Sequence, residues 1–285
     1  MMHLVLWTVI IGLSIIKISV QRDNLNIHLP LMLMDTAKDD QSKLYRFAVG
    51  ANKALQKYQH QHKQQGQQKN GEKIDFGAKH NPHVTLYMAM FDRSKRKDLL
   101  RTLERVVSEH RGPIQITIPF PSNPTVAGPY AMYDNPMTPA LQSLCDDIVQ
   151  AVRPYLHPSG NNDMPPWVKT VQPAEKRDRK MRYMEQYHSP NVLDEYDSHV
   201  TVGYDTTSTT KERLATLERY YNDQSEEVVT DGSNSNSSND DDDVNNNVEN
   251  TISMRIRHVA IGKVGVAGTV LKGGILRAFA LSKKD

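Results

Sequence analysis

The sequence contains little cysteine, little net charge and no apolar run of membrane-spanning length. Its single cysteine, Cys145, excludes an internal disulfide and a zinc site built from several thiolates. It lies in an apolar helical pattern, where a buried, unreactive thiol is the usual case. A formal net charge of +2 does not by itself predict a nucleic-acid partner. With 38% hydrophobic and 24% charged residues, the 285-residue chain is typical of a globular protein, and we expect one domain with two lobes.

The longest apolar stretch lies at the N-terminus, between Leu4 and Ile16, interrupted only by Thr8, Gly12 and Ser14. It is shorter than the roughly 20 apolar residues that a membrane span needs, and its length fits a signal-peptide core, although no Lys or Arg precedes it. We therefore expect residues 1–20 to be a signal peptide or a signal anchor. A signal peptide predicts a secreted or lumenal protein of the secretory pathway. A signal anchor predicts attachment to the membrane.

Two polar segments separate the patterned parts of the chain. Residues 58–70 are rich in Gln, His and Lys, which indicates a polar loop or a frayed helix end. Residues 223–250 are mostly Ser, Asn and Asp and have few large apolar side chains. Such a segment cannot bury enough surface to offset its ordering entropy. We therefore expect a disordered acidic insertion at about 223–250 within a single bilobal domain at 26–285.

The rest of the sequence alternates between strand and helix patterns without regular βαβ repetition, which predicts an α+β fold. Thr138-Pro139 supplies an N-cap and a first-turn proline, and Thr209 with Glu212 forms a capping-box pattern. We expect helices at 43–58, 97–110, 138–155 and 209–221. We expect strands at 27–34, 84–91, 114–118, 130–133, 199–204, 252–256 and 274–281, with a glycine-rich turn at 262–268.

A short motif occurs twice in the chain. The sequence Asn-Pro-His-Val-Thr-Leu at 81–86 returns as Asp-Ser-His-Val-Thr-Val at 197–202, and each copy begins a predicted strand. Side chains two positions apart on a strand share a face, so each copy directs an imidazole and a hydroxyl to one side. Two such strands side by side would place His83, Thr85, His199 and Thr201 around one pocket.

These residue types suit the cleavage of a phosphodiester. A neutral imidazole can take the proton of an attacking water or hydroxyl, and a protonated one can give a proton to the departing oxygen. Histidine does both near neutral pH because its ordinary pKa is about 6.5. The threonine hydroxyls can donate hydrogen bonds to the non-bridging phosphate oxygens. His83 and His199 are therefore the catalytic candidates, and Thr85 and Thr201 the phosphate-binding candidates, but the pattern leaves open which histidine is the acid.

Three other interpretations of the motif remain. His-x-Thr is short, and a structural histidine accounts for one copy, although two strand-initial copies that share the middle valine are far rarer by chance. The two histidines could ligate zinc, but no nearby carboxylate or cysteine supplies a convincing third ligand, so we expect no metal and no cofactor. The pair could also line a pocket that only binds.

The paired motifs and the stretch 191–204, Asn-Val-Leu-Asp-Glu-Tyr-Asp-Ser-His-Val-Thr-Val-Gly-Tyr, resemble the 2H phosphoesterase superfamily. That superfamily includes RNA 2′,3′-cyclic phosphodiesterases and 2′-5′ RNA ligases. The resemblance covers residues 27–281. It implies a bilobal α+β fold in which two small antiparallel sheets form a concave cleft with helices outside. It also implies that His83 and Thr85 lie in one lobe and His199 and Thr201 in the other.

The combined interpretation is a metal-independent cyclic phosphodiesterase that acts on RNA or nucleotide 2′,3′-cyclic phosphates, or on related oligonucleotide ends, as a monomer. The alternative is a catalytically inactive RNA- or nucleotide-binding module on the same fold. Tyr87 and Tyr204 are candidates for stacking on a base, and Arg177 and Lys180, from a basic cluster, for contacting phosphates. The natural substrate stays open, as does the choice between hydrolysis, ligation and exonucleolytic trimming.

Overall fold

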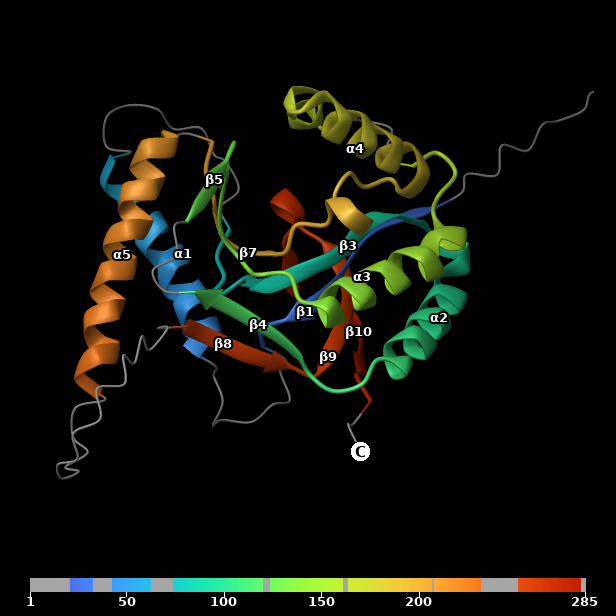
Figure 1. Ribbon diagram of the computed structural model, residues 1–285, viewed down its shortest axis with the longest axis horizontal. Helices are drawn as coiled ribbons and strands as arrows, with labels where there is room; N and C mark the ends of the chain where they lie inside the picture. The colour runs from blue at the N-terminus through green and yellow to red at the C-terminus, as the bar shows by residue number, and fades with distance from the viewer. Residues whose placement is uncertain are drawn as a thin grey trace, which may run out of the picture.

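The computed structural model describes residues 21–32, 43–62, 74–119, 124–160, 164–206, 208–231 and 251–282. An eight-stranded antiparallel sheet runs through it in the order β2-β10-β9-β1-β3-β7-β6-β5, and β4 pairs with β8 in a separate two-stranded sheet (Figure 1). The strands are β1 (Arg22–Pro30), β2 (His80–Asn81), β3 (His83–Asp92), β4 (Ile114–Pro119), β5 (Thr125–Ala127), β6 (Tyr130–Asp134), β7 (His199–Tyr204), β8 (Thr251–Ile256), β9 (His258–Val264) and β10 (Val270–Ala280).

The eight-stranded sheet is joined in its middle by a single residue pair. Val84 on β3 lies opposite Val200 on β7, whereas the neighbouring ladder between β1 and β3 runs along nearly the whole of both strands. Strands β2, β10, β9, β1 and β3 thus form one half, and β7, β6 and β5 the other. The predicted α+β fold is confirmed. The two small sheets that the resemblance implies are joined here into one strand order.

Helices pack on both sides of this junction. Helix α1 lies beside α5, and α2 lies against α3, while α4 projects at the edge of the molecule (Figure 1). α1 also contacts β7, and α3 contacts β3. The helices of the described residues are α1 (Lys43–His62), α2 (Arg96–Glu109), α3 (Pro139–Val152), α4 (Ala174–Tyr187) and α5 (Thr210–Asp231).

Helix α1 covers one face of the sheet at the junction. A row of fully buried side chains crosses the strands there, because Tyr133 lies opposite Val200, Val200 opposite Val84, and Val84 opposite Leu29. Phe47 of α1 packs against Tyr133, with 4.9 Å between the ring centroids. Side chains alternate between the two faces of a strand. The residues on either side of the two valines therefore point away from α1.

The two predicted helix caps, at Thr138 and at Thr209, are both confirmed. The Thr138 hydroxyl accepts the backbone N–H of Leu141 at 3.2 Å, so it caps α3. At the start of α5, the N–H of Thr209 donates to the Glu212 carboxylate at 2.7 Å, and the N–H of Glu212 donates to the Thr209 hydroxyl at 3.2 Å. These two contacts form a reciprocal capping box.

Several predicted boundaries need correction. Helix α5 continues to Asp231, beyond the predicted end at 221, and so occupies the first part of the expected acidic insertion. The rest of that insertion, 232–250, lies outside the described residues. Helix α1 likewise runs to His62, into the polar segment at 58–70. Helix α4 and strand β9 were not predicted, and β9 includes part of the expected glycine-rich turn.

The N-terminal segment 1–20, expected to be a signal peptide or anchor, also lies outside the described residues. Among the helices that the structure does describe, none has both the length and the apolar character of a membrane span.

Candidate active site

The pair that joins β3 to β7 brings the two copies of the motif together. Its two valines belong to the face under α1, so the residues beside them share the opposite face. Continued by one residue in each direction, this antiparallel register sets His83 across from Thr201 and Thr85 across from His199. Side chains directly opposite one another have Cβ atoms about 4.5–5.5 Å apart. The four residues therefore form one cluster, two imidazoles and two hydroxyls at alternate corners, which we call the His–Thr quartet.

Each histidine is held in the same way by the backbone carbonyl two residues before it. Nδ1 of His83 lies 2.8 Å from the carbonyl oxygen of Asn81, and Nδ1 of His199 lies 2.9 Å from the carbonyl oxygen of Asp197. A carbonyl oxygen only accepts, so each Nδ1 carries a hydrogen and donates it. In both rings Nε2 is then the atom left for proton transfer.

The two histidines differ in their surroundings. His83 is 7% exposed, whereas His199 and both threonines are half-buried. Burial lowers the pKa of His83 to about 4; its hydrogen bond to Asn81 opposes this shift, and repulsion from His199 and His80 adds to it. His83 is therefore neutral at physiological pH, and the repulsion from His199 agrees with the proximity that the register gives.

Strand β1 adds two polar side chains that were not predicted from the sequence. Nδ2 of Asn26 lies 3.2 Å from Nε2 of His83 and 3.1 Å from Oγ1 of Thr85. The ring of His28 packs edge-on against that of His83, with 5.0 Å between centroids. Both added residues are fully buried. A signal for them exists, because 24, 26 and 28 are polar while 25, 27 and 29 are apolar, a strand with one polar face.

Strand β6 brings a carboxylate to the same face. Asp134 lies opposite His199 in the β6–β7 ladder, and its carboxylate accepts the hydroxyl hydrogen of Thr125 at 2.7 Å. This residue was not among those predicted from the sequence. It gives the exposed edge of the quartet a negative charge beside the more accessible histidine.

Of the two predicted aromatic contacts, one lies on the quartet face farther along its strand and one is enclosed. A register shift in the β6–β7 ladder places Tyr204 opposite Tyr130 and on the same face as Thr201, with 5.2 Å between the two tyrosine rings. Tyr87 is 1% exposed, and its hydroxyl donates to the carbonyl oxygen of Tyr187.

The two predicted basic contacts both lie on α4. Lys180 is buried, and its Nζ lies 3.1 Å from a carboxylate oxygen of Glu195 and 2.8 Å from the side-chain oxygen of Asn191. Arg177 is half-buried and pairs at 3.3 Å with the neighbouring Asp178. Lys180 thus fixes the segment that leads into the second motif, whereas Arg177 lies nearer to solvent.

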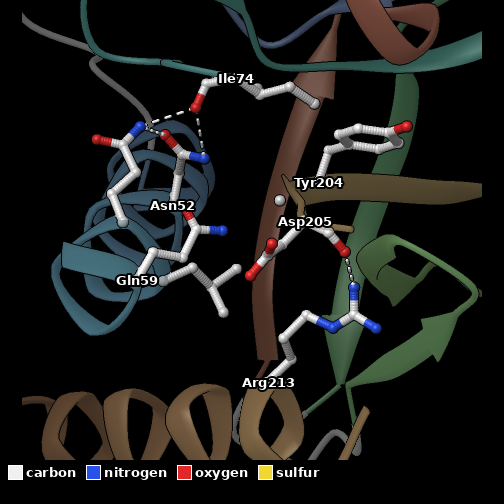
Figure 2. A pocket seen from close by; sticks show the side chains of 9 residues that line it. Asn52, Gln59, Ile74, Tyr204, Asp205 and Arg213 are labelled. Atoms are coloured by element: carbon white, nitrogen blue, oxygen red, sulfur yellow. Dashed lines mark hydrogen bonds between the residues drawn. The ribbon is translucent and has the colours of Figure 1, made fainter. Parts of the chain in front are cut away.

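A small cavity lies apart from the quartet, between α1, the end of β7 and α5 (Figure 2). Its volume is about 10 Å³, the room that one water molecule needs. The buried Arg213 lines it, and its guanidinium donates to the carbonyl oxygens of Asp205 and Gly128. This arrangement ties α5 to the β5–β6 turn. Among the described residues, no group of three or more His, Cys, Asp or Glu side chains is placed to hold a metal ion.

Comparison with solved structures returns several chains that are similar to this one at low sequence identity. Escherichia coli LigT with NADP+ is 10% identical, with 92% of this chain and 99% of that chain covered and a TM-score of 0.40. A structure described as a phosphoesterase is 12% identical, with 91% and 99% covered and a TM-score of 0.40. TT0787 of Thermus thermophilus is 9% identical, with 92% and 100% covered and a TM-score of 0.43.

No curated protein matches the sequence. A protein-family model does match, over residues 85–231, just over half of the 285 residues. The matched region contains the second motif and Thr85, and it ends where α5 ends. The chain therefore belongs to the family described as protein of unknown function DUF1045.

Proposed function

We propose that this protein is a metal-independent phosphodiesterase that cleaves RNA or nucleotide 2′,3′-cyclic phosphates, or related oligonucleotide ends, by acid–base catalysis with His83 and His199. The observation that carries the proposal is the register of Val84 opposite Val200, which sets two imidazoles and two hydroxyls on one face. The choice of a cyclic phosphate rests on the resemblance of the paired motifs to the 2H phosphoesterases.

The reaction needs one proton acceptor and one proton donor. Nε2 of one histidine takes the proton of the attacking water or hydroxyl as its oxygen bonds to phosphorus. The other imidazolium gives its proton to the leaving oxygen as the old P–O bond breaks. Thr85 and Thr201 donate to the non-bridging oxygens, where negative charge grows in the transition state. Because two imidazoles supply both proton transfers, the proposed reaction requires no metal ion.

The test is an assay of the full chain on nucleoside 2′,3′-cyclic phosphates, on RNA ending in a cyclic phosphate and on linear 2′-5′ and 3′-5′ oligonucleotides. EDTA is present throughout. We expect turnover by the wild type, and a loss of at least about 100-fold in His83→Ala and in His199→Ala. Activity that disappears with EDTA and returns with zinc would contradict the proposal.

Binding without turnover would support the alternative, an inactive RNA- or nucleotide-binding module. The same assays, run with purified protein of measured mass in solution, test the proposal that the protein acts as a monomer. We also propose that residues 1–20 direct it to the secretory pathway. Retention of a reporter fused to these residues in the cytosol would contradict that.

A further inference from the structure

The amide of Asn26 lies beside the first histidine, and three acceptors compete for its hydrogens. Its Nδ2 is 3.2 Å from Nε2 of His83, 3.1 Å from Oγ1 of Thr85 and 3.1 Å from the carbonyl oxygen of Gly268. An amide nitrogen has two hydrogens. One of them is taken by the carbonyl, and the second is shared between the histidine and the threonine.

The carbonyl of Gly268 fixes which way the amide points. In the opposite orientation the amide oxygen would face that carbonyl oxygen, and two acceptors would be in contact. The turn at 266–268 holds the carbonyl in place, because the N–H and hydroxyl of Thr269 both donate to the carbonyl of Val266, at 3.1 and 2.7 Å. Gly268 has a φ of +79°, a conformation that suits glycine. The Oδ1 atom of Asn26 is buried without a hydrogen-bond partner among the described residues, so donation decides the orientation.

The orientation of the amide determines the proton on His83. Because Nδ2 donates, Nε2 of His83 has to accept and carries no hydrogen. Nδ1 donates to the Asn81 carbonyl at 2.8 Å. The ring is therefore held neutral, with its hydrogen on Nδ1. His199 shares the Nδ1 contact, but within the described residues no amide faces its Nε2.

The geometry points to Asn26 as a positioning residue that makes His83 the proton acceptor of the pair and leaves His199 as the proton donor. This inference rests on the proposed function. Before the attacking water or hydroxyl gives its proton to Nε2 of His83, the Asn26 N–H directs its hydrogen bond to Oγ1 of Thr85 alone, which frees the Nε2 lone pair to take that proton. His199 protonates the leaving oxygen, and exchange of protons with solvent restores both rings. The near symmetry of the two motifs is thus broken by one residue outside them.

The titratable groups that face His83 come from three strands and agree with this assignment. They are His28 on β1, His80 on β2 and His199 on β7. His80 and His199 lower the pKa of His83, and His83 in turn lowers the pKa of His28. Burial acts in the same direction and is the largest cause of the lowered pKa of His83.

The experiment is a long-range ¹H–¹⁵N NMR titration of the histidine-labelled full chain, with kcat/KM measured over the same pH range. In the wild type we expect His83 to be neutral, with its hydrogen on Nδ1, at pH 5 and above. At that pH the solution is already about one unit above the pKa of His83. Asn26→Asp replaces the donor by a carboxylate. It should raise the pKa of His83 by about one unit or more and move the acidic limb of kcat/KM equally upward.

Asn52→Asp is the matched control, because Asn52 is a similarly buried amide on α1 that donates to the carbonyls of Val202 and Ile74. It should lower stability without moving the titration of His83. A wild-type His83 with its hydrogen on Nε2, or charged at neutral pH, would overturn the inference even if Asn26→Asp does not fold. An unshifted titration in a folded Asn26→Asp protein would overturn it too. Absence of turnover on every substrate would instead defeat the proposed function, because the NMR result does not depend on catalysis.

Discussion

The hydroxyl of Tyr196 donates a hydrogen bond to the backbone carbonyl of Thr85 at 2.9 Å. The contact links the segment before the second motif to the strand of the first. Tyr196 is 9% exposed, and burial raises the pKa of its hydroxyl, so the donor keeps its proton. This bond therefore connects the segment that leads into His199 with the strand that carries Thr85.

Tyr196→Phe should therefore affect both stability and rate. Losing a buried hydrogen bond lowers the free energy of unfolding by about 1–2 kcal/mol. A small shift between the two strands should lower kcat by about 10- to 100-fold, because acid–base catalysis depends on sub-ångström positioning. The control is Tyr155→Phe, which removes a hydroxyl that contacts Thr102 at 2.7 Å. It should cost stability only, and an equal loss of kcat in both variants would contradict the expectation.

Stability should fall as the solution becomes acidic, because two buried rings resist protonation. Burial lowers the pKa of His28 to about 3 and that of His83 to about 4. In the unfolded chain both rings take up a proton below about pH 6.5. The unfolded state thus binds more protons between about pH 6.5 and 3, and the free energy of unfolding decreases as the pH falls through that window.

Thermal unfolding from pH 7.5 to pH 4 measures this effect. His28→Leu removes one of the two rings and should make the pH dependence shallower, by up to about 1.4 kcal/mol for each pH unit inside the window. A variant whose unfolding depends on pH as steeply as that of the wild type would show that His28 is protonated in the folded state.

The two threonines should matter less than the histidines and not equally. Thr85→Val and Thr201→Val keep the side-chain shape and remove a donor to the phosphate, which should lower kcat by up to about 100-fold. Thr85 also accepts from Asn26 at 3.1 Å, so its replacement should lower the melting temperature more than that of Thr201. Steady-state kinetics and thermal unfolding of both variants test the order.

Combining the two histidine replacements tests whether the rings work together. His83→Ala with His199→Ala should lose far less activity than the product of the two single losses, because residues that act as a unit are not additive. Multiplicative losses in the double variant would mean that the rings act in separate steps.

Replacing the two basic residues proposed as phosphate contacts should have different effects on stability and on KM. Glu195 is buried among Lys180 and Arg179, with contacts of 3.1 and 2.6 Å. Lys180→Met breaks that buried cluster and should lower the free energy of unfolding by about 3 kcal/mol. Arg177→Ala removes a more exposed pair and should change it by less than about 1 kcal/mol. If Arg177 contacts RNA, its replacement raises KM at low salt, whereas an unchanged KM removes it from the site.

The elements with strong local signals could be predicted from the sequence. The bounds of β7 are those predicted, and both helix caps form, because alternation and capping residues act within a few positions. Helix α4 gave no such signal. Its buried residues are Lys180, Met184 and Tyr187. Lys180 is held there by an ion pair with Glu195 and is not part of an apolar stripe. A charged sequence of this kind becomes helical through tertiary contacts that the pattern does not contain.

The candidate site divides in the same way. The repeated motif identified four residues, because each His-x-Thr pair shares a face by local geometry alone. Asn26, His28 and Asp134 join them only through strand pairing across the sheet. Strand β9 pairs with the edge of β1 that β3 leaves open, and it begins one residue after β8 ends. Gly262 lies within it and Gly265 follows it directly, so the sequence favours a turn there. Pairing partners distant in the chain decide such positions.

The single pair between β3 and β7 has a consequence for how the proposed activity returns when the chain refolds. Neither half of the sheet contains the whole quartet, since each supplies one imidazole and one hydroxyl. The two halves meet in the sheet at one residue pair, so the quartet is complete only after both halves have formed and docked. During refolding, secondary structure and burial of the apolar core should therefore return before turnover does. The time at which turnover returns would then report when the two halves of the sheet dock.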